Sequence, residues 1–162
     1  MAFLLTALAG STANAEQPQV APATCPVTRP GGGLHENASL SVGLNDKYVF
    51  RPGGQGFVDS DGALGIKVLW TRKVRGQLQV GGRRLDGKAP PARAYISDLG
   101  ETGIQPSYLL FPAPGCWEIT GQVGDDKLTF VVLVEKVGTG PEWRMQGPTP
   151  GFRVSSITVS GV

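Results

Sequence analysis

Residues 117–134 read WEITGQVGDDKLTFVVLV, and this stretch decides the fold. Its first half alternates in polarity, with Trp117, Ile119 and Val123 on one predicted face and Glu118, Thr120 and Gln122 on the other. This period of two is typical of a β-strand that is buried on one side. The turn-forming residues Gly124-Asp125-Asp126 then predict a tight hairpin. Residues 128–134 are apolar on both faces, so the second strand is expected to be central or covered by another segment.

Around this hairpin, short strand-like runs recur between turn signals, and no window shows a sustained helical period. In residues 64–71, for example, Ile66, Val68 and Trp70 share one face. The 24 Gly and 13 Pro among 162 residues also suit many short strands and turns. We therefore predict an all-β, immunoglobulin-like antiparallel β-sandwich of about seven to nine strands. The predicted strands are 38–44, 48–50, 64–71, 77–85, 92–97, 108–111, 117–123 and 127–136.

The predicted sandwich is a single domain over residues 38–137. Residues 16–37 are rich in Pro, Ala, Gly and Thr and lack a periodic pattern, which predicts an irregular N-terminal arm. Residues 138–162 begin as a Gly/Pro-rich linker and end in a β-prone run from 152 to 160. That run is open to three interpretations: an added edge strand, a flexible tail, or a strand donated to another molecule.

The N-terminus reads as a signal peptide over residues 1–15. Residues 2–10 are apolar and far shorter than a membrane span, and Ala13-Asn14-Ala15 places small residues where a signal peptidase requires them. Cleavage is predicted before Glu16. No Lys or Arg precedes the apolar run, so either the signal is atypical or the first residue lies inside a longer signal. No later segment resembles a transmembrane helix, and we predict an extracytoplasmic protein, secreted or associated with the cell envelope.

Export explains the two cysteines. In an oxidising compartment an isolated pair forms one disulfide, here Cys25–Cys116. Cys116 lies on the polar face of its predicted strand, so this disulfide is not expected to cross between the sheets. We expect it to attach the arm to the outside of the sandwich, near the corner at residues 112–115.

Residues 111–119, FPAPGCWEI, resemble a segment of a family of uncharacterised exported bacterial proteins and lipoproteins. The likeness also includes residues 82–86, GRRLD, and residues 89–91, APP. This resemblance implies export and no particular activity. More broadly, Pro114-Gly115 before Trp117 is similar to the corner that opens the penultimate strand of immunoglobulin-like domains, where the aromatic residue is usually tyrosine. The corner hydrogen bond is then expected from an indole N–H.

The residue inventory favours neither catalysis nor a cofactor. His35 is the single histidine and lies in the predicted arm, and no Gly-x-Ser-x-Gly motif accompanies it. A zinc site needs clustered Cys and His side chains, and this sequence has one histidine and two cysteines that are expected to form a disulfide. Asp59-Ser60-Asp61-Gly62 resembles the opening of a calcium loop, but no bidentate Glu follows at the required spacing, so a β-turn is favoured. We predict no catalytic residues, no metal and no cofactor.

Charge is unevenly distributed along the chain. Between Lys67 and Arg93 there are eight basic residues and one acid, Asp86, although the net charge is only +2 and implies no nucleic-acid partner. One interpretation is an anion-binding patch, and the other is that these residues solvate sheet edges and pair with acids later in the chain. The candidate patch comprises Arg72, Lys73, Arg75, Arg83, Arg84 and Lys88.

These features predict an exported, non-catalytic binding module whose partner is a protein or an anionic polymer of the envelope. The alternative is a secreted inhibitor or accessory subunit that presents loops to a partner enzyme. A hydrolase or redox enzyme is the third hypothesis, and the residue inventory argues against it.

Overall fold

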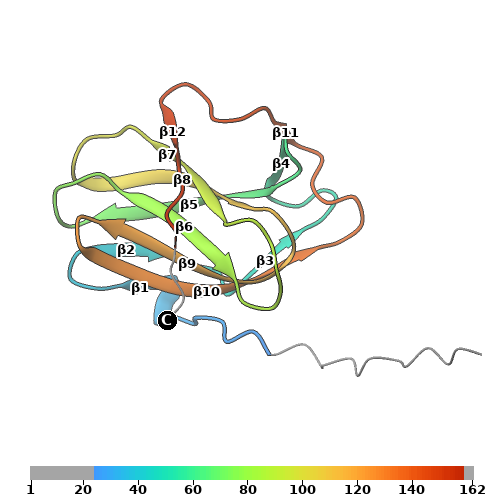
Figure 1. The fold of residues 1–162 in the computed structure, drawn as a ribbon, viewed down its shortest axis with the longest axis horizontal. Coiled ribbons are helices and arrows are strands. Elements are labelled where there is room, and N and C mark those ends of the chain that lie inside the picture. The colour runs from blue at the N-terminus through green and yellow to red at the C-terminus, as the bar shows by residue number, and fades with distance from the viewer. Residues whose placement is uncertain (1–23, 159–162) are drawn as a thin grey trace, which may run out of the picture.

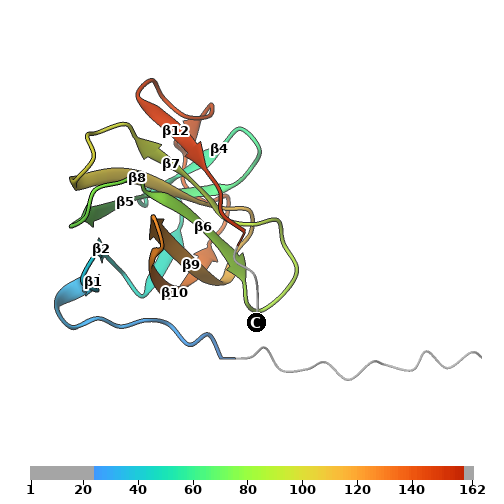
Figure 2. The same cartoon turned by 60° about the vertical axis from the view of Figure 1, so that its left-hand side comes forward.

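The computed structural model describes residues 24–158, so the predicted signal peptide and its cleavage site lie outside the described residues. The chain forms two sheets packed face to face, a β-sandwich (Figures 1 and 2). A single turn of 3₁₀ helix at Gly31–Gly33 precedes the first strand. Within the described residues no helix is long and apolar enough to cross a membrane.

Twelve strands make up the two sheets. Their bounds are β1 Leu34–Glu36, β2 Leu40–Gly43, β3 Lys47–Phe50, β4 Phe57–Asp59, β5 Leu64–Arg72, β6 Gln79–Arg84, β7 Arg93–Ser97, β8 Gly103–Phe111, β9 Gly115–Val123, β10 Asp126–Lys136, β11 Arg144–Met145 and β12 Phe152–Ser155. Each of the eight predicted runs overlaps one of these strands. Strands β1, β4 and β11 were not predicted, because two or three residues are too few to show an alternating pattern.

The larger sheet has eight strands and the smaller has four. The order in the larger sheet is β1-β2-β5-β8-β7-β12, with β4 pairing β5 and β11 pairing β4. The order in the smaller sheet is β3-β10-β9-β6. The predicted antiparallel arrangement holds for all strand pairs except β3–β10 and β4–β11, which are parallel. Parallel pairing is possible there because a long stretch of chain separates the members of each pair.

The core lies between the sheets and follows the predicted alternation. Trp117, Ile119 and Val123 of β9 are buried, as is Phe130 of β10. The Trp70 ring packs against the backbone of β9 so closely that a Cβ on Gly121 would lie 2.4 Å from it. The hairpin between β9 and β10 turns through two residues, Gly124 and Asp125, as the turn signal predicted.

A corner precedes β9. Gly115 has φ +147°, and a Cβ there would lie 2.5 Å from Nε of Arg84, so this position requires glycine. Pro114 lies in the exposed bend before it. Trp117 donates its indole N–H to the carbonyl oxygen of Ala113 at 3.0 Å. The corner hydrogen bond therefore comes from an indole, as the sequence predicted.

The disulfide joins Cys25 to Cys116, with 5.5 Å between the Cα atoms. After Cys25, the N-terminal arm runs along the part of the β10 edge that β3 does not cover. Figure 2 shows the arm beneath β10. There Thr28 exchanges two hydrogen bonds with the backbone of Val131, and His35 lies 3.0 Å from the carbonyl oxygen of Thr129. The segment predicted to be irregular thus includes one strand, β1, which pairs with β2.

The C-terminal segment packs on the outer side of the larger sheet. Strand β12 pairs with β7, so the run from Phe152 forms an edge strand within its own chain. Met145 and Phe152 contribute to a second apolar cluster with Phe57, Tyr95 and Leu110. The segment predicted as a linker therefore carries a strand, β11, and core contacts.

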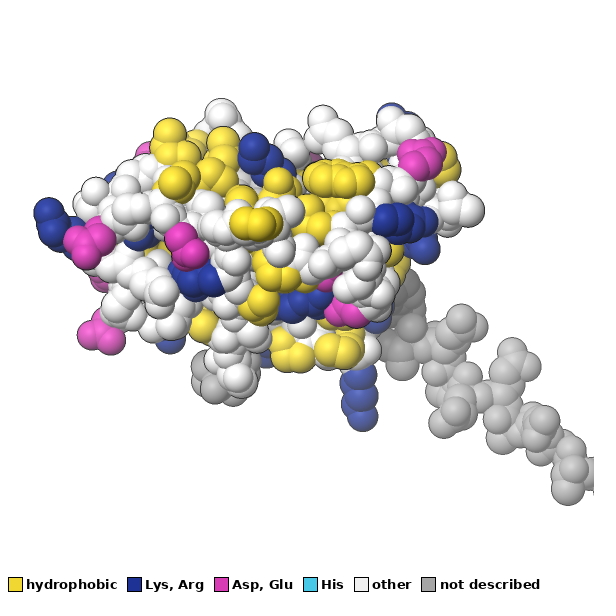
Figure 3. All heavy atoms as spheres, turned by 90° about the horizontal axis from the view of Figure 1, so that it is seen from above, with side chains coloured by type: hydrophobic (Ala, Val, Ile, Leu, Met, Phe, Trp, Pro, Cys, Tyr) yellow, Lys and Arg dark blue, Asp and Glu magenta, His cyan; other side chains and the backbone are white. Residues whose placement is uncertain are grey.

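The outer face of the larger sheet remains partly apolar. Leu69, Ile104 and Val154 are exposed there, and Figure 3, which views the molecule from the side of β12, shows hydrophobic side chains gathered between charged ones.

Candidate functional site

The predicted basic patch divides into two groups at opposite ends of β6. Arg72, Lys73 and Arg75 lie where the chain leaves β5, before β6 begins. The second group lies at the end of β6 and in the loop that follows it, and comprises Arg83, Arg84 and Lys88. The six residues of β6 span about 17 Å, and Figure 1 shows the two connections on opposite sides of the molecule. The structure therefore does not bring the six residues together.

Most of these cations are paired with acids. The pairs are Lys73–Glu36 at 2.6 Å, Arg75–Glu101 at 3.0 Å, Arg83–Glu118 at 2.8 Å and Arg84–Asp86 at 2.7 Å. Arg83 and Glu118 are direct cross-strand partners in the β6–β9 register. Counting charges along the chain misses such pairs, since register decides them. Lys88 is exposed, and no ion pair involves it among the described residues.

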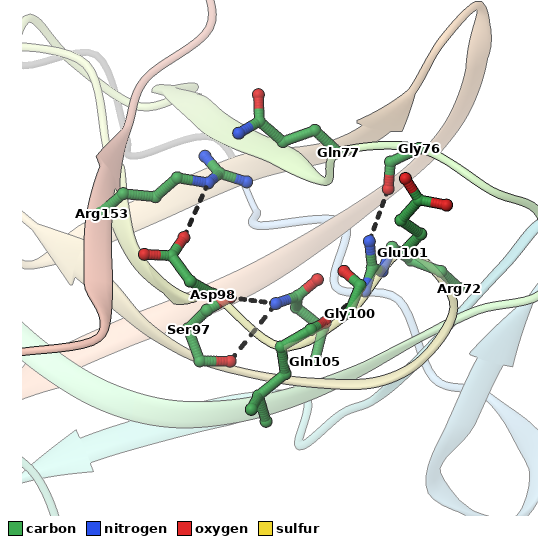
Figure 4. Close-up of a pocket in the computed structure, with 10 residues that line it drawn as sticks. Arg72, Gly76, Gln77, Ser97, Asp98, Gly100, Glu101, Gln105 and Arg153 are labelled. Atoms are coloured by element: carbon green, nitrogen blue, oxygen red, sulfur yellow. Dashed lines mark hydrogen bonds and ion pairs between the residues drawn. The ribbon is translucent and has the colours of Figure 1, made fainter.

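Arg72 is different, because it is 3% exposed. It lies at the end of β5 on the same face as Val68 and Trp70, and its side chain lines a cavity of about 260 Å³. The residues around this cavity come from the β5–β6 connection, the β7–β8 connection, β8 and β12 (Figure 4). Besides Arg72, the polar and charged side chains that line it include Ser97, Asp98, Glu101, Gln105 and Arg153. We call this cavity the arginine pocket.

The Arg72 guanidinium contacts backbone oxygens and no carboxylate. It donates to the carbonyl oxygens of Gly76 at 2.5 Å, Leu99 at 2.7 Å and Gly100 at 2.9 Å. Its Nε is buried and has no hydrogen-bond partner. Among the described residues no acid lies within ion-pair distance of it, although Glu101 lines the same pocket and acts on its charge from farther away. Burial of a guanidinium is unfavourable unless hydrogen bonds or a counter-ion compensate for the lost water, and a bound anion would supply the counter-ion.

Arg153 of β12 enters the pocket from the opposite side (Figure 4). Its Nε lies 3.7 Å from Oδ1 of Asp98, and it donates to the carbonyl oxygen of Leu78. Burial lowers the pKa of Arg72, the charge of Arg153 lowers it further, and Glu101 opposes both. Burial also lowers the pKa of Arg153, against the influence of Asp98. The two guanidinium groups thus repel each other, and an anion between them would stabilise both.

The rest of the pocket combines polar side chains with Leu99 and two glycines. Gln105 is buried and donates to the backbone and hydroxyl oxygens of Ser97, which fixes the amide in place. Cavities that hold drug-sized ligands measure roughly 300–1,000 Å³, so the arginine pocket suits a smaller group. Guanidinium groups bind carboxylate, phosphate and sulfate, so a small anion that bridges Arg153 and an N–H of Arg72 that is not bonded to a carbonyl oxygen would match the pocket.

Sequence reasoning found Arg72 but not its setting. The predicted strand ended at Thr71, whereas the alternation of β5 extended by one residue places Arg72 on the buried face with Val68 and Trp70. Extending the alternating pattern of residues 64–71 by one residue would therefore have predicted that the Arg72 side chain is buried. Arg153 and Gln105 gave no signal, because they are 81 and 33 residues away from Arg72 in the chain (153 − 72 and 105 − 72).

The calcium-like segment forms the turn between β4 and β5. The amide of Gly62 donates to the carbonyl oxygen of Asp59 at 2.9 Å, and Arg93 lies 2.8 Å from both Asp59 and Asp61. The guanidinium occupies the position a cation would need. In the part of the chain that the structure describes, no three His, Cys, Asp or Glu side chains are grouped to hold a metal ion.

Comparisons of the sequence with protein-family models and with curated proteins find no match.

Proposed function

We propose that this chain is an exported, non-catalytic binding module with an immunoglobulin-like sandwich, and that it recognises an anionic group in the arginine pocket. The observation that carries the proposal is Arg72, a residue that is 3% exposed and that makes no ion pair with a carboxylate within residues 24–158. Outside a cell, the available anions include acidic polysaccharides, wall polymers and lipid headgroups. An anionic component of the cell envelope is the ligand that we favour.

Three features support an extracytoplasmic location. The disulfide Cys25–Cys116 suits an oxidising compartment. Residues 1–15 have the pattern of a signal peptide, and residues 111–119 resemble exported bacterial proteins. N-terminal sequencing of protein collected outside the producing cell should return Glu16 as the first residue. A first residue of Met1 would contradict export by this signal.

The position of the single histidine supports a non-catalytic role. His35 lies on β1, and its side chain reaches β10, where Nε2 is engaged with the carbonyl oxygen of Thr129 and the ring packs edge-on against Phe130. These contacts hold the arm against the smaller sheet. With Nε2 held by a backbone carbonyl, only Nδ1 is left to accept a proton in a Ser/His mechanism.

Titration of the mature protein with small anions tests the site. Inorganic phosphate and glucuronate are suitable probes, followed by NMR of the Arg72 and Arg153 side chains or by calorimetry. We expect millimolar-range binding that shifts both guanidinium signals and is lost in Arg153→Gln. The matched control is Arg83→Gln, which removes an exposed arginine at the opposite end of β6 and should leave binding unchanged.

Equal binding by the wild type and Arg153→Gln would exclude the arginine pocket as the site. A second experiment identifies the source of the anion. The protein should be retained by purified envelopes and released by soluble acidic polysaccharide. Retention by a soluble partner enzyme instead would favour the alternative, an inhibitor or accessory subunit.

A further inference from the structure

Strand β3 leaves one edge without a strand partner. It is the terminal strand of the smaller sheet and pairs only with β10. Leu133 of β10 donates to the carbonyl oxygen of Asp46 at 3.2 Å. In a parallel pair, the residues that bond to a given neighbour alternate along the strand. The even-numbered residues therefore face β10, and the N–H and C=O groups of Lys47 and Val49 face away from it.

The other borders of the smaller sheet are covered. The arm lies along the first part of β10, as described above. On β6, Val80 donates to the hydroxyl oxygen of Ser155 at 2.8 Å, and Gly82 exchanges backbone hydrogen bonds with Ala92. Within residues 24–158, the outer edge of β3 is thus the part of this sheet whose backbone N–H and C=O groups remain available to a further strand. Natural proteins usually protect such an edge.

A groove follows this edge. It has a volume of about 510 Å³ and is formed by residues from the segment 45–55 together with Ile66 of β5. Val49 is 37% exposed on the outer face of β3, whereas Ile66 is partly exposed on the inner face of β5, so the groove offers an apolar contact on each face of an added strand. Its volume lies within the range of cavities that bind ligands. The groove therefore provides both unpaired backbone groups and a place for an apolar side chain.

The lining residues are Asn45, residues 47–51, residues 53–55 and Ile66, so Asp46 is not among them and both charged side chains of the groove are basic. Lys47 pairs with Glu135 at 2.7 Å, whereas Arg51 is exposed and makes no ion pair among the described residues. An occupant with an Asp or Glu side chain beside Arg51 would complement this charge. A neutral or basic occupant would not.

We propose that the groove beside β3 binds an extended segment of a partner protein as an added strand, with apolar side chains against Ile66 on the inner face and Val49 on the outer face, and an acidic side chain at Arg51. Main-chain hydrogen bonds to Lys47 and Val49 supply the pairing, and the side chains supply the selectivity. This surface is separate from the arginine pocket. Ile66 and Arg72 lie near opposite ends of β5, about 20 Å apart along the strand.

Panning a phage-displayed library of random decapeptides against the mature protein tests this surface. We expect the selected peptides to be enriched in alternating apolar residues with one Asp or Glu. Val49→Pro removes an outward-facing N–H and also changes the side chain on the outer face of the groove, at a position where an edge strand tolerates proline. Loss of that hydrogen bond should weaken the selected peptides by roughly tenfold. Arg51→Glu leaves the backbone intact and should weaken them at least as much.

Two controls make the result decisive. Arg153→Gln, in the arginine pocket, and Arg83→Glu, on β6, should bind the selected peptides as the wild type does. Amide hydrogen exchange of the wild type gives an independent readout: the amides of Lys47 and Val49 should exchange rapidly when free and become protected by peptide. The inference is overturned if no peptide is enriched, if both groove variants bind like the wild type, or if those two amides stay unprotected in the complex.

Discussion

Trp117 donates its indole N–H to the carbonyl oxygen of Ala113 at 3.0 Å, so one side chain of β9 both fills the core and fastens the loop that precedes its own strand. The ring is fully buried and packs against Phe111 at 5.8 Å between centroids. Its neighbour Glu118 points to the opposite face, where it meets Arg83. Adjacent residues thus have very different structural roles.

This arrangement predicts very different costs of substitution. Trp117→Ala should lower the free energy of unfolding by about 3–5 kcal/mol, since it leaves a large cavity. Glu118→Ala breaks a partly exposed ion pair and should cost less than about 1 kcal/mol. Chemical denaturation of both variants checks this prediction, and similar losses would mean that the faces of β9 are wrongly assigned.

Much of the sandwich was predictable from local pattern, and the reasons are visible in particular residues. The hairpin at Gly124 and the buried face of β9 follow from turn chemistry and alternation, which depend on neighbours in the chain. The pairing of Arg83 with Glu118 depends on register between strands 35 residues apart, which no local pattern contains. Arg153 reaches the arginine pocket only because β12 pairs with β7.

Reduction of the disulfide should release the arm from the smaller sheet. The chain-entropy model assigns about 4–5 kcal/mol to closing a loop of this length, for a sequence separation of 91 residues. Cys25→Ser should therefore unfold at a lower denaturant concentration than the oxidised protein. Its Val131 amide, which donates to Thr28 at 2.9 Å, should exchange faster.

The Phe130 amide, which lies within the β9–β10 ladder, is the internal control. Equal exchange at Val131 in both forms would show that the arm holds without the bond.

Asp59 should make stability fall at acid pH. Burial raises the pKa of this carboxyl, but hydrogen bonds from Tyr95 and Gly147 and the charge of Arg93 outweigh burial, so the pKa lies below its ordinary value of 3.8. A lowered pKa in the folded state means that the stabilisation is present above the pKa of the unfolded chain and is lost as pH falls through the folded value.

Asp59→Asn should therefore flatten the acid side of the stability curve and cost roughly 1–3 kcal/mol at neutral pH, since it leaves buried partners unsatisfied. Asp61→Asn is the matched control, because Asp61 contacts the same arginine but is largely exposed. Denaturant unfolding at a series of pH values from about 2 to 7 measures both. An unchanged acid limb in Asp59→Asn would assign the acid sensitivity to other carboxyls.

Attachment to envelopes should depend on salt and on the arginine pocket. Raising ionic strength from about 0.05 to about 0.5 M shortens the Debye length from roughly 14 to roughly 4 Å, which screens the approach of a polyanion. The wild type should therefore co-sediment with purified envelopes at low salt and be released at high salt.

Arg153→Glu should fail to attach even at low salt, because it places a carboxylate opposite Asp98 and beside Arg72. The double variant Arg83→Glu/Arg84→Glu should attach normally, since these two arginines are already paired with Glu118 and Asp86. Loss of attachment in that double variant, with Arg153→Glu unaffected, would move the anion site to the far end of β6.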